Sequence, residues 1–85
     1  MPVLTNPVDI VIRAYDRSGL LRDVSQVLLN ERINVLAVNT RSNKEDNTAL
    51  MSLTIEIPGL DALGRLLGRI SQLPNIIETR RNRTP

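Results

Sequence analysis

The fold of this chain is decided by residues 8–24, which read VDIVIRAYDRSGLLRDV. From Val8 to Tyr15, apolar side chains alternate with other side chains, as in a β-strand with one buried face. From Gly19 to about Glu31, apolar residues instead recur at the spacing of an amphipathic helix. The stretch therefore predicts a strand, a turn that contains one glycine, and a helix.

The turn is also the first candidate ligand site. Glycine lacks the Cβ that blocks close approach, and the first N–H groups of a helix have no partner within it, so a small anionic or zwitterionic group could bind there. The candidate residues are Asp16, Arg17, Ser18, Gly19 and Leu20. The alternative interpretation is structural: Ser18 or Asp16 caps the helix, and the glycine fits the turn.

The rest of the chain predicts four more elements. Residues 33–42 are expected to form a strand, residues 43–47 a polar hairpin loop, and residues 48–57 a strand with regular alternation. Residues 60–73 carry the apolar stripe of a second helix, and residues 76–81 form a short last strand. Strict alternation in the 33–42 strand gives it two apolar faces, with Ile33, Val35 and Ala37 on one and Leu36 and Val38 on the other.

The resulting order, βαββαβ, predicts a ferredoxin-like α+β sandwich of two layers in one domain, residues 1–85 with a core at about 7–81. Both helices cover one face of an antiparallel four-stranded sheet of order 4-1-3-2, because right-handed crossovers place the first and third strands in the centre. Apolar side chains on the open face or its edges suggest dimerisation or docking to another domain. These residues are Val11, Tyr15, Leu36, Val38 and Leu50.

The composition excludes most simple enzymes. The chain has no cysteine and no histidine, which removes thiolate and imidazole metal ligands and the usual neutral-pH general base. The acidic residues show no metal-loop spacing, so neither a metal ion nor a cofactor is expected. No apolar run approaches the roughly 20 residues of a membrane span, and the N-terminus has no signal-peptide pattern, so we expect a cytoplasmic protein without a membrane partner.

Two asparagines, Asn34 and Asn39, interrupt the apolar 33–42 strand. We expect the start of this strand to lie near the glycine turn, where the amide of Asn34 could bridge the amine and carboxylate of a ligand. The alternative is that Asn34 closes the loop after the first helix through its own hydrogen bonds to the backbone.

The quoted stretch, together with Ile33-Asn-Val and the strand that begins at Thr48, resembles an ACT domain. It is most similar to the C-terminal ACT domain of RelA/SpoT-type (p)ppGpp synthetases and hydrolases, the GTP pyrophosphokinases of the stringent response. The resemblance implies a regulatory module, without catalysis of its own, excised from the C-terminus of a longer multidomain enzyme. Its implied partners are a second copy, the other domains of the parent enzyme and the ribosome.

The resemblance also implies a ligand. Many ACT domains bind a free amino acid where two copies meet, through the turn after the first strand and the start of the second strand. Carried over by position, the binding residues are Asp16, Arg17, Ser18, Gly19 and Leu20, with Asn34 opposite.

An RNA-docking or ribosome-docking module without a small-molecule ligand is the competing function. Arg65 and Arg69 in the second helix and the arginines of residues 80–83 favour it, because they could attract phosphates. Tyr15 is the only aromatic residue of the chain, which argues against readers that stack successive bases on a sheet. Binding of this kind should weaken steeply with salt.

A small enzyme is the third interpretation. Acylphosphatases share the expected architecture, and Arg17 with Asn34 or Asn39 would be the rough analogues of their phosphate-binding pair. The glycine-rich anion loop that such an enzyme needs is missing from the sequence.

Overall fold

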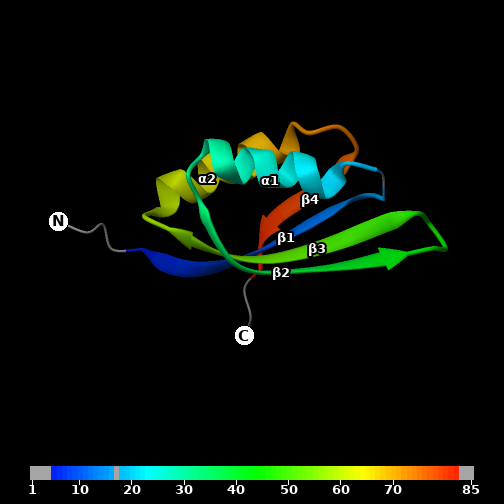
Figure 1. The fold of residues 1–85 in the computed structure, drawn as a ribbon, viewed down its shortest axis with the longest axis horizontal. Helices are drawn as coiled ribbons and strands as arrows, with labels where there is room; N and C mark the ends of the chain where they lie inside the picture. Colours follow the sequence, from blue (N-terminus) through cyan, green and yellow to red (C-terminus); the bar gives the residue numbers. More distant parts are fainter. Residues whose placement is uncertain (1–4, 17, 83–85) are drawn as a thin grey trace.

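The computed structural model describes residues 5–16 and 18–82. Its elements are β1 (Asn6–Tyr15), α1 (Leu20–Asn30), β2 (Asn34–Asn43), β3 (Thr48–Ile57), α2 (Leu60–Ser71) and β4 (Ile76–Arg81). Both helices lie on one face of the sheet, and the opposite face is open (Figure 1). Neither helix is long and apolar enough to span a lipid bilayer, as judged over the described residues.

The sheet has the expected order, β2-β3-β1-β4, with antiparallel pairing throughout. The two central strands pair along their whole length, from Asn6 opposite Ile57 to Tyr15 opposite Thr48. The predicted ferredoxin-like sandwich and its 4-1-3-2 order are therefore confirmed. β2 and β4 are the edges, so each has one side of its backbone without a strand partner among residues 5–16 and 18–82.

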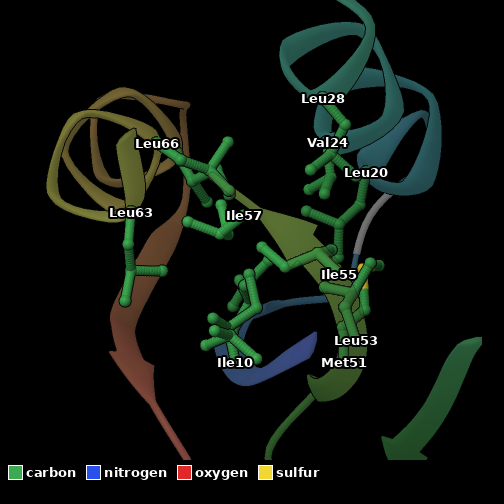
Figure 2. Packing of buried hydrophobic residues seen from close by; sticks show 14 of the residues in the cluster. Ile10, Leu20, Val24, Leu28, Met51, Leu53, Ile55, Ile57, Leu63 and Leu66 are labelled. Carbon is green, nitrogen blue, oxygen red and sulfur yellow. The ribbon is translucent and has the colours of Figure 1, made fainter. Parts of the chain in front are cut away.

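The core lies between the helices and the central strands, where leucines of both helices point toward the sheet (Figure 2). Every second residue of β1 and β3 contributes to it, which confirms the alternation expected for these two strands. Burial of these side chains is the main favourable term for a domain of this size. The largest fully buried ones are Ile10, Ile12, Met51, Ile55, Leu66, Ile70 and Val24.

β2 departs from the expected alternation at a bulge. Leu36 has no partner on β3, because Val35 and Ala37 pair with consecutive residues of that strand. An inserted residue reverses the faces of all residues that follow it. Val38 consequently pairs with the core residue Leu53 and lies on the helix side of the sheet. The expected grouping of Ala37 with Val35, and of Val38 with Leu36, is therefore wrong.

The open face is less apolar than the sequence suggested. The pairing places Val11, Tyr15 and Leu50 on it, but Val11 is only 7% exposed because neighbouring strands flank it on both sides. Among the residues that the strand pairing places on the open face, the large apolar residues that remain exposed are thus Tyr15 and Leu50. Most other positions on this face are polar or charged, among them Asp9, Arg13, Asn39, Arg41, Ser52, Thr54 and Glu56.

Candidate functional site

A hollow of about 410 Å³ lies on the helix side of the sheet, between the start of α1 and strands β2 and β3. Its floor is apolar and consists of Leu20, Ala49 and Met51, none of which is more than 5% exposed. Its rim is polar and includes Asp16, Arg22 and Thr40. An apolar floor with a few polar groups at the rim is the usual construction of a small-molecule site.

Gly19 forms the wall of this hollow at the start of α1. It is the N-cap residue and has φ 87° and ψ 0°, a left-handed conformation that glycine adopts without a steric cost. Its carbonyl accepts a hydrogen bond of 2.9 Å from the N–H of Asp23. The cap position that was expected for Ser18 or Asp16 thus belongs to a residue without a side chain, and the cap makes no side-chain hydrogen bond.

Two backbone hydrogen bonds hold the turn against neighbouring loops. The N–H of Tyr15 donates to the carbonyl of Asn75 at 2.9 Å, and the N–H of Asp16 donates to the carbonyl of Asn47 at 2.7 Å. Asn47 and Asn75 both have positive φ, at 58° and 68°, in the region that asparagine tolerates better than most residues. The turn is therefore fixed at the same end of the sheet as the β2–β3 hairpin.

Asn34 does not lie near this turn, contrary to expectation. It pairs with Glu56 at the far end of β3, and its Nδ2 donates a hydrogen bond to the Glu56 carboxylate. The turn lies beside Thr48, which is eight residues away along β3, or about 27 Å at the rise of an antiparallel strand. The expectation failed because β2 runs antiparallel to β3, so the end of β2 is close to the turn and its start is distant.

Thr40 is a rim residue that the sequence did not reveal. It pairs with Met51, which places its hydroxyl-bearing side chain on the helix side of β2. Strict alternation from Val35 would have placed Thr40 on the open face, and the bulge at Leu36 reverses that placement. The two apolar faces of this strand were the only sequence signal of an irregularity.

The candidate RNA-binding arginines of α2 are engaged within the chain. The Nε atom of Arg65 lies 2.9 Å from one carboxylate oxygen of Glu31, and the Nε atom of Arg69 lies 3.0 Å from the other. The Glu31 side chain is only 12% exposed, so one carboxylate at the end of α1 binds two cations of α2. This arrangement stabilises the packing of the helices and reduces the positive charge that α2 offers to a phosphate.

The other expected site residues are distributed as follows. Asp16, Gly19 and Leu20 line the hollow, Ser18 is exposed beside it, and Arg17 lies outside the described residues. Asn39 pairs with Ser52 on the open face. Asn34 and Asn39 are both remote from the turn, so neither of the two asparagines on which the acylphosphatase interpretation depends converges with it.

Comparison with known proteins identifies the family. The model of the ACT domain matches residues 5–81. The chain belongs to the ACT domain family. Its relatives include the GTP pyrophosphokinase of Escherichia coli (strain K12), with 50% identity over 68 residues, which are 80% of this chain and 9% of that protein. The GTP pyrophosphokinase of Haemophilus influenzae is 39% identical over 74 residues, which are 87% of this chain and 10% of that protein.

The ACT domain also has solved structural neighbours. The crystal structure of the ACT domain from the GTP pyrophosphokinase of Chlorobium tepidum superposes with a TM-score of 0.79. It covers 93% of this chain and 100% of the neighbour at 18% identity, so it supports the fold alone. The expected resemblance to GTP pyrophosphokinases is confirmed by the sequence relatives, of which this chain spans about a tenth of the length.

Proposed function

We propose that this ACT domain is the regulatory domain of a RelA/SpoT-type GTP pyrophosphokinase or (p)ppGpp hydrolase of the stringent response. The observation that carries the proposal is the 50% identity to an Escherichia coli GTP pyrophosphokinase over 80% of the chain. The catalysis belongs to other parts of the parent enzyme. The domain acts by binding a free amino acid, by pairing with a second copy, or by both.

The hollow beneath α1 has the chemistry to bind a zwitterion. The carboxylate of an amino acid fits the first N–H groups of α1 and the guanidinium of Arg22, because both favour an anion. The ammonium group fits the carboxylate of Asp16 on the same rim. The apolar floor of Leu20, Ala49 and Met51 suits an aliphatic side chain, so branched-chain amino acids are the proposed class.

Pairing through β2 would complete this site. All ten residues of β2 are exposed, and the exposed apolar side chains Val35, Leu36 and Val38 lie along this edge. Such an edge can accept another strand. A symmetric antiparallel pair of β2 strands would place the start of one beside the end of the other, so that Asn34 of the partner subunit approaches the hollow near Thr40.

An amide NMR titration with a panel of amino acids tests this proposal. Branched-chain amino acids should give saturable shifts at Ser18, Gly19 and Leu20, and at Asn34 if the site forms between two copies. Thr40→Val should weaken binding, whereas Ser52→Ala, which removes a hydroxyl from the opposite face, should not. The absence of shifts across the panel would refute amino-acid binding, and a monomer at all concentrations would refute pairing.

Contact with ribosomal RNA and with other domains of the parent enzyme is the second candidate function. Nearly all basic residues are arginines, which suit phosphate recognition. It ranks second because Arg65 and Arg69 both bind Glu31, which leaves less free positive charge on α2 than the sequence indicated. Binding to an rRNA fragment that falls steeply with salt, with no response to amino acids, would favour it over the first candidate.

A further inference from the structure

The open face of the sheet carries a second hollow, of about 620 Å³, near the β2–β3 hairpin. Leu50 of β3 lies in it between Arg13 of β1 and Arg41 of β2, because the pairing aligns these three residues in one row across the sheet. The two arginines are thus separated by two strand spacings, or about 10 Å. Lys44 adds a third cation from the hairpin. The hairpin extends beyond the helices, which cover only the opposite face (Figure 1).

The described residues neutralise the charges of this hollow only in part. Arg41 and Lys44 make no ion pair within the described part of the chain, and Arg13 meets Asp46 at a long 3.8 Å. Asp46 also accepts a hydrogen bond of 2.7 Å from the Thr48 hydroxyl, which lowers the pKa of its carboxyl group and keeps it ionised. Glu45 is the other carboxylate in the lining. Arg41 and Lys44 therefore have no ion-pair partner among the described residues, in contrast to Arg65 and Arg69 of α2.

An aromatic ring lies beside these cations. Tyr15 occupies the next row of the same face, opposite Thr48, and is therefore about 7 Å along β1 from Arg13. Its side chain is 53% exposed, and the neighbouring Leu50 is 41% exposed. An exposed ring next to guanidinium groups is the arrangement on which proteins stack a nucleobase while they bind its phosphates.

We propose that this hollow binds a nucleoside polyphosphate, with the phosphates on Arg13, Arg41 and Lys44 and the base on Tyr15. Arg13, Arg41 and Lys44 gather at the hairpin end of the face, where Glu78 is opposite Arg13 and pairs with Arg80, whereas Asp9 and Glu56 occupy the other end. A compact polyanion fits this distribution better than an RNA strand that runs along the sheet, because such a strand would meet the carboxylates. The site is on the opposite face from the amino-acid hollow, so it goes beyond the proposed function.

The test is a calorimetric and amide NMR titration of the chain with GTP, with inorganic tripolyphosphate and with a uridine oligonucleotide. GTP should give saturable shifts at residues 41–44 and at Tyr15, with an affinity that falls as salt rises. The double variant Arg41→Gln/Lys44→Gln should raise the Kd for GTP about tenfold or more. The matched control Arg32→Gln/Arg81→Gln removes the same charge from exposed positions outside the hollow and should change the Kd less than about threefold.

The substitution Tyr15→Leu tests the binding of the base separately from the binding of the phosphates. It should raise the Kd for GTP about fivefold or more and leave the Kd for tripolyphosphate unchanged. Equal affinities for GTP and tripolyphosphate would overturn the assignment of a nucleoside. Tighter binding of the oligonucleotide than of GTP would identify RNA as the ligand instead. Absence of shifts at residues 41–44 would overturn the site. Because amino-acid binding is followed at Gly19 and Leu20, either proposal can fail while the other holds.

Discussion

Replacement of Glu31 by glutamine should destabilise this ACT domain by about 1–2 kcal/mol. The carboxylate is 12% exposed, and each of its oxygens binds the Nε atom of a different arginine, Arg65 at 2.9 Å and Arg69 at 3.0 Å. Glutamine preserves the size of the side chain but removes its charge and one of its two acceptor oxygens. The change therefore tests the electrostatic connection between α1 and α2 without opening a cavity.

The magnitude follows from the exposure of the partners. The two arginine side chains are 61% and 59% exposed, so water screens both contacts. Exposed ion pairs contribute about 0.2–1 kcal/mol each, and the short distances here place both near the top of that range. The loss of the carboxylate also leaves two arginines four residues apart on α2, which adds a repulsion of about 0.2–0.5 kcal/mol.

Urea unfolding followed by circular dichroism measures this effect. Glu45→Gln is the control, because Glu45 is exposed and its carboxylate makes no hydrogen bond or ion pair within the described residues. The loss for Glu31→Gln should shrink in about 1 M NaCl, and it should largely disappear when Arg65 and Arg69 are already glutamines. A loss below about 0.3 kcal/mol, or one that persists without the arginines, would refute the proposed interaction.

Four further substitutions test α2, the turn and the hairpin. Gly64→Ala and Gly68→Ala should each raise the free energy of unfolding by about 0.5–1 kcal/mol, because an added Cβ meets no atom within 4 Å; a decrease would contradict this. Gly19→Ala should lower the free energy of unfolding by about 1–2 kcal/mol, because the backbone φ of this residue is 87°. An unchanged midpoint of thermal unfolding would contradict this expectation. The hydrogen bond from Thr48 lowers the pKa of Asp46, so this group should stabilise the fold at neutral pH and lose its contribution as the pH falls through the lowered pKa. Asp46→Asn should remove that part of the acid dependence of the urea midpoint, and an unchanged dependence would contradict the assignment.

Regular periodicity made most of the fold predictable. From Val8 in β1 and throughout β3, every second residue carries an apolar side chain toward the helices, so the face assigned from the sequence is the face that forms the core. The glycine turn was predictable because Gly19 separates the two periodicities, and the structure places it in a left-handed conformation. The start of α1 was not predicted in detail, since a glycine occupies the cap that polar side chains were expected to fill.

The candidate site was only partly predictable. Asp16, Gly19 and Leu20 follow from the turn, and the structure places all three at one hollow. Thr40 could not be recognised, because its side of the sheet depends on the bulge at Leu36. Asn34 is distant from the turn because β1 and β2 both run antiparallel to β3, which places the start of β2 at the opposite end of the sheet from the end of β1.

The sequence by itself determined the order of the elements, the sheet order and the buried faces of β1 and β3, because these depend on local periodicity and on the handedness of crossovers. Only the tertiary structure decided which side chains meet. The neutralisation of the α2 arginines by Glu31 and the row of Arg13, Leu50 and Arg41 both join residues that are far apart in the chain. Such contacts depend on strand register and helix packing, and a shift of one residue in register moves a side chain to the other face.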